Sequence, residues 1–286
     1  MHDIFYFTDV HGCYDLYRAA IDYCFKQDPE CMIVYGGDAC DRGTSGYQIM
    51  KELLDNPRVV YLKGNHEDLF VRAAQFIARD YDGAINSDEI WNYLYNCEVR
   101  DYGSAEVQLH IYNGGFHTLY DWMMDGMPME FVNRINDLPI TFSTDTLDFC
   151  HAGGRYKEFQ QVARDEYDEQ LINADDLMMT IWDRNYLGQG WAPDRTCIFG
   201  HTPTIHLPSK YYGRDKSIEN IHPCAYNALL DDKWTGRKVD MDVATAISGK
   251  LYVLDCFTMN AQGFKDPDLE IENQKHDVKK IEVIQF

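Results

Sequence analysis

Seven side chains that can bind a metal ion follow short apolar runs of the sequence. They are Asp9, His11, Asp38, Asn65, His66, His151 and His201. Apolar runs of this length are typical of buried strands, so each candidate is expected on the loop that follows a strand. In open α/β sheets, ligands bind beyond the carboxyl ends of the strands. We therefore expect these side chains to converge at one edge of a sheet.

Glycine stands beside most of these candidates in short motifs. The motifs read GDACDRG from Gly37, GNHE from Gly64, CHAG from Cys150 and GHTP from Gly200. Tight turns after strands, and a backbone that comes close to a ligand, both favour glycine. A single Asp-x-His pattern arises often by chance. The recurrence of a strand followed by a ligand is the stronger indication of a site. No histidine lies four residues after His66, which excludes a helical zinc-protease motif.

The elements that position these residues alternate between strand and helix in the first third of the chain. Strands are predicted at 3–8, 32–35 and 59–62, and helices at 16–24, after Gly46 and at 67–78. Three βα units predict a largely parallel sheet. Later helices are predicted at 79–113 (an insertion), 118–124 and 129–138. Later strands are predicted at 140–142, 146–150, 196–199, 250–256 and 280–286. The polar segments 155–176 and 205–237 are interpreted as surface excursions.

Composition limits the classes of function. The chain has 286 residues, of which 45% are hydrophobic and 26% charged, so it is a folded globule rather than a disordered, collagenous or coiled-coil chain. Its length fits two domains or one large α/β unit. The formal net charge of -21 repels nucleic-acid polymers and anionic membranes, so we expect neither as a partner. Any phosphate must be bound by local positive charge.

Other features favour a cytoplasmic protein. No apolar run approaches the roughly 20 residues needed to span a bilayer, and the first seven residues do not resemble a signal peptide. The nine cysteines form no C-x-x-C pair, and most fall inside expected strands or helices. We interpret them as packing residues in a reducing compartment.

The motifs resemble those of the calcineurin-like metallophosphoesterases. The resemblance is to the PPP family of serine/threonine phosphatases and, within it, to the bacterial and phage branch typified by lambda phosphatase. It extends from Asp9 to about Asp242 and includes NGGFHTL from Asn113, LP at Leu138 and IWDR from Ile181. Thr8 stands where the family usually has glycine, and we expect this departure to cost little.

The resemblance implies an α/β fold with a central β-sandwich of mixed sheets flanked by helices and a helical cap or insertion. It also implies that residues 1–286 form a single metallophosphoesterase domain. Insertions are then expected near 79–112, 155–176 and 205–237.

The resemblance also implies two divalent metal ions, Mn²⁺ before Fe or Zn. Asp9, His11 and Asp38 would hold one ion. Asp38, Asn65, His151 and His201 would hold the other, so that Asp38 bridges the pair. Two such ions outweigh the two carboxylates, so the local charge would be positive and would attract a phosphate dianion despite the acidic chain.

The catalytic roles likewise follow from the resemblance. The two ions would lower the pKa of a shared water to roughly 7, and the resulting hydroxide would attack phosphorus directly. Arg42 and Arg184 would bind the phosphoryl oxygens. His66 would protonate the leaving oxygen as general acid, with Asp41 orienting its ring. Asp242 would support the site without binding metal.

Three functions remain open from the sequence. The first is a phosphomonoesterase acting on phosphorylated proteins or small phosphate esters. The second is a diadenosine polyphosphate or phosphodiester hydrolase on the same dinuclear site, which the retained Asp41-Arg42-Gly43 disfavours. The third is a non-catalytic binding module. The sequence determines neither the physiological substrate nor the oligomeric state. Six histidines that occupy no matching motif position are assigned structural or surface roles: His2, His110, His117, His206, His222 and His276.

Overall fold

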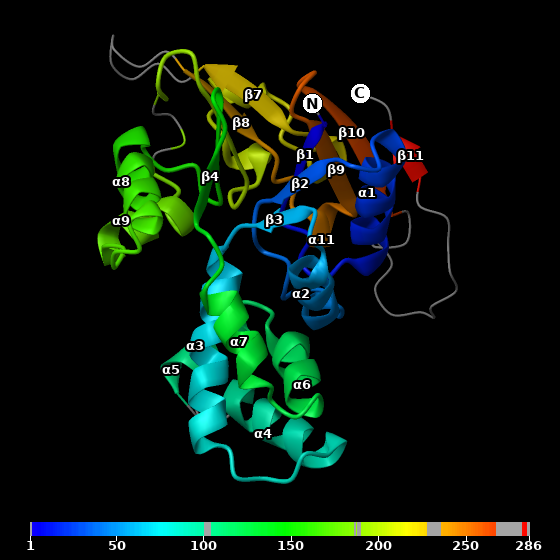
Figure 1. Ribbon diagram of the computed structural model, residues 1–286. Helices are drawn as coiled ribbons and strands as arrows, with labels where there is room; N and C mark the ends of the chain where they lie inside the picture. The colour runs from blue at the N-terminus through cyan, green and yellow to red at the C-terminus, as the bar shows by residue number, and fades with distance from the viewer. Residues whose placement is uncertain are drawn as a thin grey trace.

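Two mixed β-sheets pack face to face in the computed structural model, with helices around them (Figure 1). The structure describes residues 2–99, 104–185, 187, 190–227, 236–266 and 282–284. The prediction of an α/β fold built on mixed sheets flanked by helices is confirmed.

The first sheet has the strand order β11-β10-β9-β1-β2-β3. Its parallel half consists of β1 (Ile4–Phe7), β2 (Met32–Tyr35) and β3 (Val59–Tyr61). Its antiparallel half consists of β9 (Lys250–Asp255), β10 (Asn260–Lys265) and β11 (Glu282–Ile284). The three predicted βα units are therefore present, and their strands end at one edge of the sheet.

The second sheet has the order β4-β5-β6-β8-β7. Its three central strands run parallel: β5 (Leu147–Cys150), β6 (Thr196–Phe199) and β8 (Arg237–Asp240). The edge strands β4 (Thr141–Ser143) and β7 (Cys224–Asn227) are antiparallel to them. The interpretation of 205–237 as a surface excursion is wrong for β7. Cys224 and Tyr226 alternate with exposed neighbours and are buried on one face of the strand.

The two sheets bury an apolar layer between them. Tyr6 of β1 and Phe149 of β5 stack with ring centroids 5.7 Å apart. The same cluster includes Val34, Leu62, Ile198 and Val239, which come from both sheets and are all buried. Burial of this layer fixes one sheet against the other, so the loops after both sets of parallel strands are held in register.

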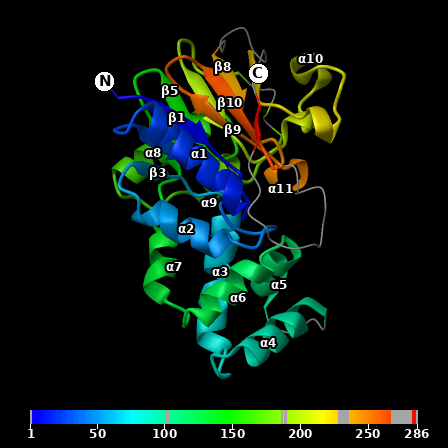
Figure 2. The same cartoon turned by 90° about the vertical axis from the view of Figure 1, so that its right-hand side faces the viewer.

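Helices cover the outer face of the first sheet. Here α1 (Tyr14–Gln27) and α2 (Gly46–Asp55) pack on the sheet. From β3 the chain enters α3 (Asn65–Asp80), and four further helices gather around α3 below the sheets (Figures 1 and 2): α4 (Ser87–Val99), α5 (Ala105–Tyr112), α6 (Phe116–Met124) and α7 (Met129–Asn136). Phe70 of α3 lies at the centre of this group, against the rings of Trp122 and Phe131.

The segment 155–176, interpreted as a surface excursion, is largely exposed and is mostly helical. It contains α8 (Tyr156–Tyr167) and the start of α9 (Ala174–Ile181). One face of α8 buries Phe159 and Val162, and Glu166 accepts a hydrogen bond from the Thr141 backbone N–H. Polar residues on the other face concealed this apolar stripe in the sequence.

The remaining elements are short. They are the 3₁₀ turns η1 (Thr204–His206) and η2 (Ile218–Asn220), with the helices α10 (Ser209–Tyr212) and α11 (Thr245–Ser248). Eight of the nine cysteines are buried, and Cys13 is partly buried. None of the helices in the described ranges combines the length and apolar character needed to cross a lipid bilayer.

Candidate metal centre

The loops that follow the parallel strands of both sheets meet at one place. The backbone N–H of His201, after β6, donates to both carboxylate oxygens of Asp9, after β1, at 3.1 Å. The ring Nδ1 of His151, after β5, lies 2.7 Å from the carbonyl oxygen of Gly36, after β2. The candidates predicted from different parts of the sequence are thus brought together.

The backbone turns sharply at several of these candidates. Asp9, His11, Asp38 and His201 have φ angles of 54°, 48°, 59° and 69°, which is the left-handed region that residues with a Cβ seldom adopt. Hydrogen bonds between the loops hold this conformation, among them Asp9 N–H to Gly37 O at 3.0 Å. A cluster of strained residues in one place is typical of a functional site.

Asp38 is the centre of the arrangement and is only 2% exposed. Its Oδ1 lies 3.3 Å from His151 Nε2 and accepts a hydrogen bond of 3.0 Å from the His66 N–H. Its Oδ2 lies 3.6 Å from His11 Nε2. Two groups of buried potential ligands share this carboxylate: His11, Asp38 and His66 in one, and Asp38, His151 and His201 in the other. In each group the ligand atoms lie within 4.8 Å of one another, and such donors fit a divalent cation.

Backbone carbonyls orient the imidazole rings toward this centre. The Nδ1 atoms of His11 and His151 lie 2.9 Å from Cys40 O and 2.7 Å from Gly36 O. A carbonyl oxygen can only accept, so Nδ1 carries a proton in both rings and Nε2 is the atom that faces Asp38. His201 is reversed, because its Nε2 lies 2.9 Å from the Trp182 carbonyl and its Nδ1 faces inward.

Asn65 contributes an amide oxygen to the second group. Its Oδ1 lies 2.8 Å from His201 Nδ1 and 3.0 Å from His151 Nε2. Asp9 lies beside the groups rather than in them. Its Oδ2 accepts a hydrogen bond of 2.7 Å from the Thr8 hydroxyl, so the residue that replaces the usual glycine holds this carboxylate.

Burial and mutual charge set the protonation of the ligands. Burial and the charge of Arg42 lower the pKa of His11, and burial and the charge of His151 lower that of His201, so both rings are neutral ligands at pH 7. Burial would raise the pKa of Asp38, but the positive histidines around it outweigh burial and hold it well below its usual value. Burial lowers the pKa of His151, yet the charge of Asp38 more than compensates and raises it to about 10.

Asp9 differs from Asp38 in its electrostatics. Burial raises its pKa to about 6, and the charge of His151 only partly opposes this effect. At neutral pH Asp9 is therefore largely ionised and available to a cation.

Glu67 organises the loops and was not assigned a role from the sequence. It is fully buried, and its Oε2 accepts hydrogen bonds from the N–H groups of Asp38 and Gly64, both at 2.8 Å. Its Oε1 accepts from Ala39 N–H and the Tyr61 hydroxyl, also at 2.8 Å. Glu67 is the third residue of α3 and accepts from the N–H of the preceding Gly64, which is the glutamate half of a capping box and could have indicated this role.

Of the four proposed catalytic side chains, His66 belongs to the first group and the other three lie around the centre. His66 Nδ1 lies 2.7 Å from Asp41 Oδ2, and its Nε2 lies 3.8 Å from Asp38 Oδ2. The guanidinium of Arg42 approaches the Nε2 atoms of His11 and His66 at 2.7 and 3.2 Å. On the other side, Arg184 Nε lies 3.3 Å from His201 Nε2. Two guanidinium groups therefore flank the centre, one beside each group of ligands.

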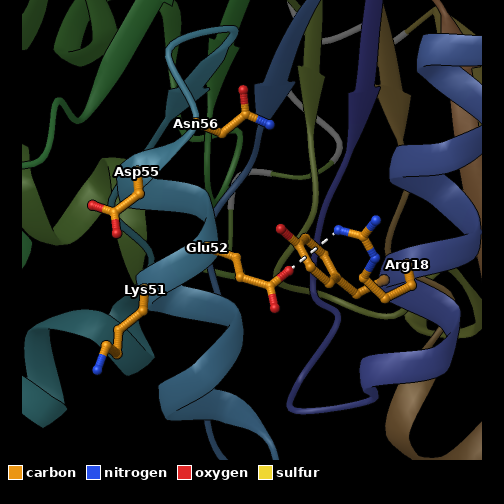
Figure 3. Close-up of a pocket in the computed structure, with 6 residues that line it drawn as sticks. Arg18, Lys51, Glu52, Asp55 and Asn56 are labelled. Carbon is orange, nitrogen blue, oxygen red and sulfur yellow. Dashed lines mark hydrogen bonds and ion pairs between the residues drawn. The ribbon is translucent and has the colours of Figure 1, made fainter.

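A separate surface hollow lies between α1 and α2 (Figure 3). It has a volume of about 440 Å³ and is lined by Tyr17, Arg18, Lys51, Glu52, Asp55 and Asn56. Both of its cations are already paired, Arg18 with Glu52 at 3.3 Å and Lys51 with Asp125 at 2.9 Å. The hollow contains none of the ligand candidates, so the chemistry belongs to the centre around Asp38.

Comparison with known proteins identifies the family. The model of the calcineurin-like phosphoesterase family matches residues 2–219. No curated protein sequence matches this chain at a significant level.

Several solved structures resemble the fold. A metallophosphoesterase from Sphaerobacter thermophilus is 11% identical, with 89% of this chain and 83% of that chain covered and a TM-score of 0.44. A cold-active protein-tyrosine phosphatase of a Shewanella species is 15% identical, with coverage of 100% and 81% and a TM-score of 0.44. A serine/threonine phosphatase from Saccharomyces cerevisiae is 13% identical, with coverage of 98% and 82% and a TM-score of 0.45.

Proposed function

Because this chain belongs to the calcineurin-like phosphoesterase family of metal-dependent hydrolases, we propose that it is a phosphomonoesterase acting on phosphoserine and phosphothreonine in proteins. Within the family we assign it to the bacterial and phage branch of the PPP phosphatases. The observation that carries the proposal is the position of His66. Its Nδ1 is bonded to Asp41 at 2.7 Å, while its Nε2 lies 3.8 Å from the central carboxylate of Asp38.

The ligands proposed for the two divalent ions divide on either side of Asp38. Asp9 and His11 are proposed to hold one ion together with Asp38. Asn65, His151 and His201 are proposed to hold the other ion with it. When bound, such ions supply Lewis acidity and make water acidic enough to provide hydroxide near neutral pH. Oxygen and imidazole donors suit Mn²⁺, with Fe or Zn as alternatives.

Arg42 and Arg184 are proposed to bind the phosphoryl oxygens. The two guanidinium groups lie beside His11 and His201, so they flank the centre from opposite sides. A planar guanidinium can donate two parallel hydrogen bonds to a phosphate, which the point charge of a lysine cannot do. Fixed on both sides, the phosphate would present its ester oxygen to His66.

The role proposed for His66 accounts for the choice of substrate. The Nδ1–H of His66 donates a hydrogen bond to Asp41, which leaves the Nε2–H to give its proton to the leaving oxygen. The alkoxides of serine and threonine are poor leaving groups and need that proton, whereas activated aryl oxides need it much less. A general acid fixed in place by Asp41 therefore favours hydrolysis of phosphoserine and phosphothreonine.

Turnover by protein reloaded with Mn²⁺ tests the proposal. Metal-free protein is given Mn²⁺ and four substrates: a phosphoserine peptide, p-nitrophenyl phosphate, bis(p-nitrophenyl) phosphate and diadenosine tetraphosphate. We expect turnover of the two monoesters and at least about tenfold lower kcat/KM on the other two. Preference for the diester or the dinucleotide would overturn the monoesterase proposal, and inactivity on all four would favour a binding module.

A further inference from the structure

A second histidine lies on the far side of Asp41. His110 Nε2 is 2.7 Å from Asp41 Oδ1, and His66 Nδ1 is 2.7 Å from Asp41 Oδ2. The three side chains are at most 2% exposed. The Thr118 hydroxyl donates to the same Oδ1 at 3.0 Å. His110 was assigned a structural or surface role from the sequence, and the structure shows that it is buried in contact with the partner of the proposed general acid.

The surroundings of His110 are built to hold its ring in one place. A Cβ on Gly115 would lie 2.1 Å from His110 Cδ2, so only glycine leaves room for the ring at this position. On another side the ring of Phe70 meets it edge to face, with centroids 6.0 Å apart. The histidine is therefore fixed by packing, as a group that positions another must be.

The polar contacts of His110 point to one purpose. Its Nδ1 is buried without a hydrogen-bond partner among the described residues, so the only side-chain hydrogen bond of the ring is the one to Asp41. An apolar side chain would fill the same space without burying an unpaired nitrogen. Burying the unpaired Nδ1 costs stability. That cost is explained if this position requires the hydrogen bond from His110 Nε2–H to Asp41.

We propose that His110 is a positioning residue of the general-acid machinery. With Thr118 it fixes Oδ1 of Asp41, so that Oδ2 keeps its direction toward His66 Nδ1. Burial raises the pKa of Asp41, but the neighbouring His110 and His66 outweigh burial and hold it well below its usual value, so Asp41 is an acceptor at both oxygens. The proposal rests on the function proposed for His66.

The proposal also links the helices around α3 to the general acid. His110 lies on α5, in the segment predicted as an insertion, and Asp41 lies on the loop after β2. The Arg42 N–H donates to Gly114 O at 3.0 Å, which ties the turn after α5 to the same loop. Cys40, Asp41 and His110 are close enough to hold a cation, but hydrogen bonds already occupy both Asp41 oxygens and His110 Nε2.

Leaving-group dependence tests the proposal in protein loaded with Mn²⁺. The variants are His110→Phe, which removes the donor, and His110→Gln, which can donate from nearly the same place. Val107→Ala is the control, because it alters another buried residue of α5. For His110→Phe we expect kcat on a phosphoserine peptide to fall about tenfold or more, with KM and bound Mn²⁺ unchanged. On 2,4-dinitrophenyl phosphate, which needs no proton, we expect a change below about twofold. His110→Gln should recover most of the loss.

Two further measurements separate positioning from general damage. In an Asp41→Asn background, His110→Phe should have no additional effect on the peptide, because its action passes through Asp41. Nuclear magnetic resonance of metal-free protein with labelled histidine should show the His66 Nδ1 proton exchanging at least about tenfold faster in His110→Phe than in wild type or Val107→Ala.

The outcomes distinguish the two proposals. Any of four results would overturn the role of His110: equal losses of kcat on both substrates, loss of bound Mn²⁺, additive effects of His110→Phe and Asp41→Asn, or an unchanged exchange rate of the His66 Nδ1 proton. A wild type that hydrolyses no monoester would instead overturn the proposed function, and the exchange measurement would still test whether His110 positions His66.

Discussion

Replacement of Glu67 by glutamine should weaken both the fold and the metal centre. The carboxylate accepts four hydrogen bonds, three of them from backbone N–H groups that include that of Asp38. The NH₂ end of the glutamine side chain can only donate. Whichever way it turns, it faces Ala39 N–H or the N–H groups of Asp38 and Gly64, and at least one buried donor loses its acceptor.

The size of the effect follows from these contacts. A lost hydrogen bond to a charged acceptor costs about 1.5–3 kcal/mol, and the unpaired donor adds to that. Burial and the charge of Asp38 raise the pKa of Glu67, which means that its charged form is disfavoured in the fold. Removing the charge therefore offsets part of the destabilisation. We take about 2 kcal/mol as the net fall in the free energy of unfolding of Glu67→Gln. Affinity for Mn²⁺ should fall about 10- to 100-fold, because the loop that carries Asp38 is no longer held.

Tyr61→Phe is the matched control for Glu67→Gln. It removes one hydrogen bond to the same carboxylate and leaves the three backbone bonds intact. We expect a loss of about 1 kcal/mol and an affinity for Mn²⁺ within about threefold of wild type. Urea unfolding of the metal-free proteins and calorimetric titration with Mn²⁺ give the two quantities. If Glu67→Gln unfolds like Tyr61→Phe and binds Mn²⁺ as tightly as wild type, the organising role of Glu67 is refuted.

Three further predictions concern metal and stability. Elemental analysis after dialysis should find that Asp38→Asn and His201→Ala lose both metal and activity while His66→Asn keeps the metal; equal metal loss in all three would contradict the assigned roles. Chelation of divalent ions should lower the Tm of wild type but not of Asp38→Asn, and an unchanged wild-type Tm would argue against a metal held by the folded state. Burial lowers the pKa of Lys238, whose Nζ donates to the carbonyls of Gly153 and Gly154 at 3.0 Å. The unfolded chain then binds more protons, so the stability of wild type relative to Lys238→Met should rise with pH from 7 toward the ordinary lysine pKa. A difference that stays flat in urea unfolding across this range would contradict a lowered pKa of Lys238 in the folded state.

The sequence sufficed to predict the convergence of the ligands for a simple physical reason. Parallel strands of one sheet place their carboxyl ends at one edge, so the candidates after β1, β2 and β3 arrive near one another, as do those after β5 and β6. The packing of the two sheets against each other, which the sequence did not show, brings the two sets together. The direction of each side chain was not predictable in the same way. Asp9 turns toward the hydroxyl of the adjacent Thr8 and toward the His201 N–H, and the second contact depends on how the two sheets pack.

Features that depend on tertiary contacts were missed. The polar composition of 155–176 concealed an amphipathic helix, α8, whose buried face is visible only against its neighbours. His110 and Asp41 are 69 positions apart, and nothing near either residue indicates that they meet. Glu67 is different, because its position at the start of α3 gives a local capping signal.

The central claim is that this fold holds a pair of divalent ions on either side of Asp38. Anomalous diffraction from crystals of the protein grown with Mn²⁺ tests it most directly. We predict two peaks per chain, one beside His11 Nε2 and one among His151 Nε2, His201 Nδ1 and Asn65 Oδ1. No peak at Asp38, or a single ion without contact to that carboxylate, would contradict the account.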